Sequence, residues 1–90
     1  MNPTHVCDGY NVRVYDDYVC WVKRCKFEGW YWYDCNVKIP KESRFYGYEE
    51  LPLRRTTHII RENVVSFTST IDDDANAWSL VMEVVDMLSS

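Results

Sequence analysis

Four cysteines and two histidines are the residues whose types and spacing could support chemistry. His5-x-Cys7 is one pair and Cys20-x₄-Cys25 is another, and thiolate and imidazole are good zinc ligands. However, structural zinc sites usually show two tightly spaced pairs. On a regular strand Cys20 and Cys25 also point to opposite faces, because they are an odd number of residues apart. We therefore expect core thiols with no metal, and a Cys/His zinc-stabilised domain is the alternative.

Catalysis has little further support in the sequence. A reactive cysteine needs a base and a lowered pKa, but neither His5 nor His58 stands in a recognisable motif with Cys, Ser or Asp. The three glycines are scattered and form no phosphate-binding loop. The acidic runs at 16–17 and 72–74 are more typical of a turn and a helix start than of a cation site. We predict no enzyme activity and no cofactor.

The segments that must position these residues are mainly strands. Runs of alternating or β-branched and aromatic residues predict strands, and Glu28-Gly29 between two such runs is typical of a hairpin turn. Residues 1–9 and 41–53 have the composition of an irregular arm and a loop. The expected strands are 11–15, 18–27, 30–39, 56–60 and 64–70.

The register of the central hairpin follows if Glu28 and Gly29 are its only loop residues. Phe27 then faces Trp30, Cys25 faces Trp32, and Lys23 faces Asp34, with Trp21 on the same face. A longer loop would invert both faces. The opposite face is the expected core face: Tyr18, Cys20, Val22, Tyr33, Cys35, Val37 and Ile39.

The C-terminal segment has the pattern of an amphipathic helix. Apolar residues recur at helical spacing between Ala77 and Leu88, and Thr70 or Asp72 can serve as the N-cap. The sequence therefore predicts one α+β domain over residues 1–90. It comprises an antiparallel sheet of four to five strands, with a central aromatic hairpin at about 18–39, packed by one helix at about 72–88.

Charge and composition exclude some functions. The net charge of −4, with five acidic and no basic residues in 72–90, argues against duplex nucleic acid, which proteins bind through clustered Lys and Arg. No apolar run approaches the length that spans a membrane. The N-terminus lacks the features of a secretory signal, so we expect a cytoplasmic protein with reduced thiols.

The aromatic residues indicate a recognition surface. Twelve of the 14 lie between Tyr10 and Tyr48, and one helix cannot cover both faces of an aromatic hairpin, so part of it should stay exposed. A protein partner is the favoured occupant. The alternative is a single-stranded nucleic-acid-binding module, because the aromatic run 30–33 lies near Lys23, Arg24 and Lys26. A homodimer is left open, since the apolar side of the helix is wide.

In size and composition the chain resembles the small, acidic, aromatic-rich proteins encoded by phages and other mobile elements, including anti-CRISPR inhibitors. Bacterial immunity proteins and antitoxins share this general character, and no residue is carried over from it. The resemblance implies a small inhibitor that occupies a partner protein's surface. The aromatic residues would be anchors and the acidic helix face would complement a basic partner. The candidate partner-binding residues are Trp21, Phe27, Trp30, Trp32, Phe45, Tyr46, Tyr48, Asp72, Asp73, Asp74, Glu83 and Asp86.

Overall fold

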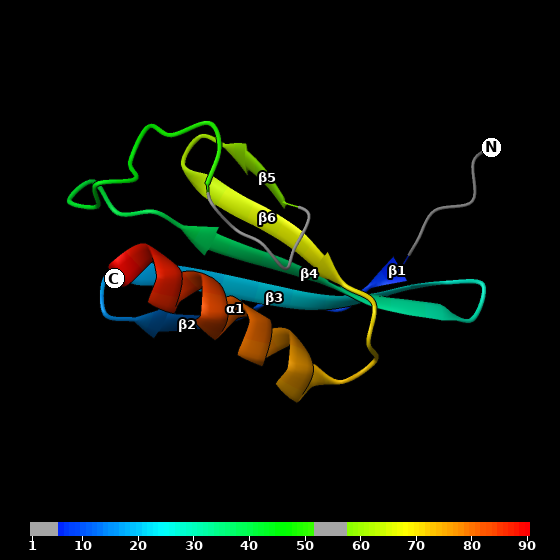
Figure 1. Ribbon diagram of the computed structural model, residues 1–90. Coiled ribbons are helices and arrows are strands. Elements are labelled where there is room, and N and C mark those ends of the chain that lie inside the picture. Colours follow the sequence, from blue (N-terminus) through cyan, green and yellow to red (C-terminus); the bar gives the residue numbers. More distant parts are fainter. Residues whose placement is uncertain (1–5, 52–57) are drawn as a thin grey trace.

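The computed structural model describes residues 6–51 and 58–90. It has the expected α+β architecture, an antiparallel sheet packed by a C-terminal helix (Figure 1). His5 and the start of the strand expected at 56–60 lie outside the described residues. The elements are β1 (Val6–Cys7), β2 (Asn11–Tyr15), β3 (Tyr18–Phe27), β4 (Trp30–Lys38), β5 (His58–Arg61), β6 (Val64–Ser69) and α1 (Asp74–Ser89).

The hairpin of β3 and β4 forms the centre of the sheet, and its register is the predicted one. Phe27 pairs with Trp30, and Glu28 and Gly29 form the two-residue turn. Both turn residues have positive φ, 48° and 84°, as a type I′ turn requires, and glycine adopts this conformation at little cost. The short loop therefore decides which residues share a face.

The strand beside β3 differs from the prediction. Residues 1–9 were expected to be irregular, but Val6–Cys7 form the short strand β1, paired with Lys26 and Cys25. β2 continues along the same edge of β3. Between the two strands, three residues (8–10) face only two on β3 (23–24), which makes a β-bulge. The expectation failed because a two-residue strand has no periodicity to detect.

The other side of the sheet is a second hairpin. β5 and β6 are joined at Glu62 and Asn63, which have φ values of 53° and 63°, so the polar break in this region is a tight turn. β6 pairs with β4. The sheet order is β1-β3-β4-β6-β5, with β2 also on β3.

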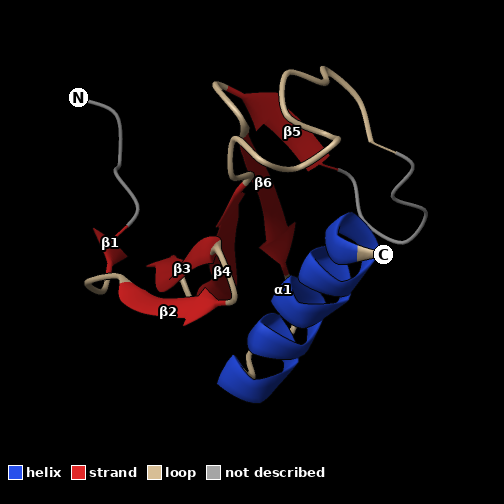
Figure 2. Ribbon diagram, turned by 90° about the vertical axis from the view of Figure 1, so that its left-hand side faces the viewer, coloured by secondary structure: helices blue, strands red, loops and turns tan. Residues whose placement is uncertain are grey.

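Helix α1 covers one face of the sheet (Figure 2). The predicted core face of the central hairpin is buried against it, and Val65 and Phe67 of β6 extend this core. The loop 41–51 contributes Phe45 and Leu51 to the same cluster. The helix side chains in the core are Ala77, Trp78, Val81, Val84, Val85 and Leu88.

The helix begins one residue later than a cap at Asp72 would place it, and three residues later than a cap at Thr70 would. Asp73 is the N-cap, and its carboxylate accepts a hydrogen bond from the Ala75 amide at 3.0 Å. Asp72 instead binds Arg24 of β3 through two 2.9 Å hydrogen bonds. Thr70 and Asp72 were wrong as caps because several Ser, Thr and Asp residues precede the helix and only tertiary contacts distinguish them.

We expect Asp73→Ala to lower the free energy of unfolding by about 1 kcal/mol, because it leaves a helix N-terminal amide without its side-chain acceptor. Urea denaturation would measure this. The matched change Asp72→Ala removes an exposed ion pair, and such pairs contribute about 0–1 kcal/mol. A larger loss for Asp72→Ala than for Asp73→Ala would contradict the assignment of the cap.

Candidate functional site

The face of the sheet opposite α1 is the candidate site, and we call it the open face. No element in the described part of the chain lies across it (Figure 2). Cross-strand pairing arranges its side chains in five rows. The rows are Phe27 with Trp30; Cys7 with Cys25 and Trp32; Lys23 with Asp34 and Thr68; Val12 with Trp21, Asn36, Ser66 and Ile59; and Val14 with Val19, Lys38, Val64 and Arg61.

Apolar side chains dominate the surface of the open face. Trp30 is 76% exposed, Ile59 is 63% exposed, and Val12 and Val14 are each 61% exposed. Trp21, Phe27, Val19 and Val64 are half-buried on the same face. Surface apolar residues are normal when scattered singly, but this many on one sheet face that no other described element covers are typical of an interaction surface.

The β-bulge explains why Val12 and Val14 belong to this surface. Strand side chains alternate between faces, so a regular strand continuing from Cys7 would turn both valines toward the helix. The extra residue in the bulge reverses that alternation. Arg13 takes the helix side instead, and its guanidinium carbon lies 4.1 Å from the centre of a Trp78 ring.

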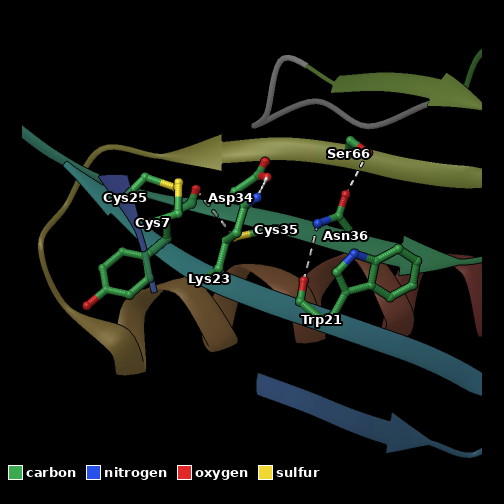
Figure 3. A network of polar contacts seen from close by, with 9 residues as sticks. Cys7, Trp21, Lys23, Cys25, Asp34, Cys35, Asn36 and Ser66 are labelled. Carbon is green, nitrogen blue, oxygen red and sulfur yellow. Dashed lines mark hydrogen bonds and ion pairs between the residues drawn. A yellow bond between two sulfur atoms is a disulfide. The ribbon is translucent and has the colours of Figure 1, made fainter. Parts of the chain in front are cut away.

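The centre of the open face is polar and ordered (Figure 3). Asn36 is buried, and its side-chain amide donates to the Trp21 carbonyl at 3.4 Å. The Ser66 hydroxyl donates to the Asn36 side-chain oxygen at 2.8 Å. Because the buried amide has partners for both its donor and its acceptor, it holds β3, β4 and β6 in register without an unsatisfied group.

Charges on the open face are few and mainly basic. The Lys23 ammonium lies 3.9 Å from an Asp34 carboxylate oxygen and 4.6 Å from the centre of the Tyr10 ring, so these two charges largely offset each other. Lys38 and Arg61 are exposed in the same cross-strand row. The open face is therefore an apolar surface with a basic margin.

The predicted binding residues fall into three groups in the structure. Trp21, Phe27, Trp30 and Trp32 do share the open face. Tyr46 and Tyr48 are exposed on the loop after β4, at the opposite end of the sheet from the turn between β3 and β4 (Figure 1). Phe45 is only 7% exposed and packs in the core, so we omit it from the candidate surface.

The predicted acidic residues do not join the open face. Asp72 is paired with Arg24, Asp73 caps the helix, and Asp74 lies in its first turn. Glu83 and Asp86 are exposed on α1, in the layer on the other side of the sheet (Figure 2). A rigid partner that contacts the aromatic residues would not reach this acidic side, so the two predicted parts of one interface are separated.

Several residues of the open face were missed by the sequence analysis. Val12, Val14 and Ile59 lie in strands that were expected, but only the sheet pairing shows which face they occupy. Lys38 and Arg61 likewise meet only through the β4–β6–β5 pairing. The alternating polar residues Asp34, Asn36 and Lys38 within an apolar strand were the local signal that this face differs from the core.

The cysteines are arranged differently from the prediction. Cys7 and Cys25 form a disulfide, so the expectation of reduced thiols is wrong for these two. Cys20 and Cys35 are free and buried against the helix. Burial raises the pKa of the Cys20 thiol to about 11 and is the main cause that raises the pKa of Cys35 to about 12, which makes both poor nucleophiles.

The alternative sites lose support from this arrangement. Residues 6–51 and 58–90 contain no group of three Cys, His, Asp or Glu side chains placed to hold a metal ion, and the two cysteine pairs lie on opposite faces of the sheet. For nucleic acid, Arg24 and Lys26 point to the helix side, away from the open-face tryptophans. The basic residues of that prediction therefore do not gather around its aromatic residues.

Comparison with family models, with curated proteins and with solved structures finds no match for the chain. Within the described residues, no helix has the length and apolar character needed to cross a membrane. The structure defines a two-layer α+β protein in which one apolar sheet face is left uncovered by the described elements.

Proposed function

We propose that the protein is a small non-enzymatic binding protein that acts by occupying the surface of a partner protein with its open face. The observation that carries this proposal is the exposure of Trp30, Val12, Val14 and Ile59 on one sheet face. Tryptophan is among the residues that contribute most to interface energetics. An inhibitor of the kind suggested by its size and composition could act in this way.

The charges of the open face favour a partner with an apolar patch bordered by carboxylates. Lys38 and Arg61 supply the basic margin, and interface charges are generally complementary. This replaces the basic partner expected from the sequence, because the acidic side of α1 faces away.

The proposal that the protein is not an enzyme rests on the low reactivity of its cysteines and on the character of the open face. Two cysteines are joined in a disulfide, and the other two are buried with raised pKa values. The exposed apolar residues of the open face are suited to broad contact with another protein, whereas ligand sites usually hold several convergent polar groups.

A cytoplasmic location is still a prediction, and the disulfide bears on it. Cytosolic proteins generally keep their thiols reduced, and the disulfides they do form are usually transient or redox-sensing. A cytoplasmic protein with this fold would therefore have a Cys7–Cys25 bond that opens and closes.

We expect Trp30→Ala to weaken partner binding by roughly 30-fold or more, equivalent to about 2 kcal/mol, if Trp30 is an anchor. The experiment is affinity capture with the wild-type protein, followed by titration of the captured partner and lysine cross-linking. Cross-links from Lys38 and Lys23 would place the partner on the open face. Tyr48→Ala is the matched control, because Tyr48 is an exposed aromatic residue elsewhere.

Two results would overturn the proposal. Equal loss of binding in Tyr48→Ala and Trp30→Ala would remove the open face as the contact. Sedimentation showing a dimer that Trp30→Ala dissociates would identify a second copy as the occupant. The double variant Val12→Thr with Val14→Thr keeps β-branched residues in β2, so the strand should still form. If the whole open face binds, this variant should weaken partner binding as Trp30→Ala does.

A further inference from the structure

The Cys7–Cys25 disulfide joins the shortest strand of the sheet to its central hairpin. The two residues are directly opposite in the pairing of β1 with β3, with their Cα atoms 4.0 Å apart. Cys25 is also directly opposite Trp32 on β4. The bond, drawn in Figure 3, therefore lies on the open face. Its row is next to that of Phe27 and Trp30.

Little else in the described residues attaches β1 to the sheet. The strand has two paired residues, and the Asp8 amide donates to the Arg24 carbonyl at 2.8 Å. The bulge separates β1 from β2, and Val6 is exposed. Two-residue strands without packed side chains are at the low end of local stability, so the covalent bond is the main attachment.

The core does not depend on this bond. The core cluster includes no residue of β1 and does not include Cys25. The remaining cysteines, Cys20 and Cys35, belong to that cluster on the other face of the sheet. Opening the disulfide therefore leaves the packing between sheet and helix intact, and the folded core offers it no competing thiol.

We propose that the Cys7–Cys25 disulfide is a thiol–disulfide exchange site that latches β1 onto the open face and releases it when a dithiol reductant opens the bond. Exchange begins by attack of a thiolate on one sulfur of the disulfide. Cys7 is the accessible end, because it is partly exposed while Cys25 is buried.

The exchange is balanced in electrons and protons. A thiolate of the reductant attacks Sγ of Cys7 and forms a mixed disulfide, and Sγ of Cys25 leaves as a thiolate that takes up a proton. The second thiol of the reductant then loses its proton and attacks the reductant's other sulfur, the one bonded to Cys7 in the mixed disulfide. Sγ of Cys7 then leaves and is protonated. The reductant ends as an internal disulfide, and two electrons have passed to the protein.

Release of β1 changes the end of the open face nearest the hairpin turn. The edge of β3 at Cys25 and Lys26 loses its paired strand, and the row of Cys25 and Trp32 loses Cys7. The effect on a partner rests on the proposed function. The disulfide-dependent attachment of β1 does not, because its opening can be measured on the isolated protein.

The test compares the oxidised protein, the protein treated with dithiothreitol, and the double variant Cys7→Ser with Cys25→Ser by residue-resolved amide hydrogen exchange. We expect the Asp8 amide to exchange roughly tenfold faster or more after reduction. The double variant should behave like the reduced protein and should not respond to dithiothreitol. Iodoacetamide applied to the folded, reduced protein should modify Cys7, and also Cys25 once β1 no longer covers it, but not Cys20 and Cys35 in the core.

Three outcomes would overturn the proposal that the disulfide holds β1 and releases it on reduction. Unchanged protection of the Asp8 amide would show that backbone pairing alone holds β1. Loss of protection in the β4–β6 ladder would make the disulfide a staple of the whole fold. Resistance of the bond to dithiothreitol until the protein unfolds would exclude it as an exchange site. None of these results depends on a partner, so they are distinct from a failure of the proposed function.

Discussion

Replacing Trp78 with alanine is expected to lower the free energy of unfolding by about 3–5 kcal/mol, as is usual for large aromatic residues removed from a core. Trp78 is 4% exposed and lies in the core cluster. Its indole contacts the Tyr15 ring edge-on, with centroids 6.4 Å apart. The substitution removes these contacts and leaves a cavity between α1 and the sheet. Guanidinium denaturation followed by circular dichroism would measure the loss.

The matched control for this prediction is Trp30→Ala, the same substitution on the open face. Because Trp30 is mostly exposed, we expect its replacement to change the free energy of unfolding by no more than about 0.5 kcal/mol. The pair therefore tests which face of the sheet is core. Comparable losses for both variants would mean that the open face is covered in the folded protein, and the proposed function would fall with it.

Alkaline pH is expected to destabilise the protein through Cys20 and Cys35. Their folded-state pKa values, about 11 and about 12, lie above the ordinary value of 9.0. Between pH 9 and 11 the unfolded chain releases two thiol protons that the folded protein retains. The free energy of unfolding then falls by about 2 kcal/mol per pH unit from the two thiols together, because the unfolded thiols are only half ionised at pH 9. Below pH 9 both states are protonated, and this contribution to stability is fully present.

Denaturation curves at pH 8, 9 and 10 would measure this dependence. The comparison is best made in a protein carrying Cys7→Ser and Cys25→Ser, because exposed thiolates would otherwise exchange with the disulfide. Adding Cys20→Ala and Cys35→Ala should remove the thiol part of the slope. The raised pKa of Tyr33, caused mainly by burial, acts in the same direction in both proteins. Equal slopes with and without the two thiols would contradict the prediction.

The central hairpin illustrates what local sequence can predict. Glu28-Gly29 fits a two-residue turn, and strand alternation then assigns every residue from Tyr18 to Lys38 to a face. The structure has the same register and buries the predicted core face. The helix was also evident from its apolar spacing. Its N-cap was not, because the adjacent residues Asp72 and Asp73 are chemically identical and only the folded structure pairs Asp72 with Arg24 and Asp73 with the Ala75 amide.

The candidate surface was predictable only in part. The four hairpin residues predicted to bind a partner, Trp21, Phe27, Trp30 and Trp32, share a face because of local alternation. Phe45, by contrast, is buried by the fold of its loop against the core. Ile59 and Arg61 join the open face only through pairing with β6. The acidic residues near the helix were expected to contact the same partner as the aromatic residues, yet the helix lies in the other layer.

By itself, the sequence determined the α+β class, the central hairpin with its two faces, and the C-terminal helix, because turns and periodicity act over a few residues. Only the tertiary structure decided the rest. The bulge at 8–10 turns Val12 and Val14 to the open face, and the pairing of β1 with β3 joins Cys7 to Cys25. These features depend on contacts between residues far apart in the chain, whose register a local pattern does not encode.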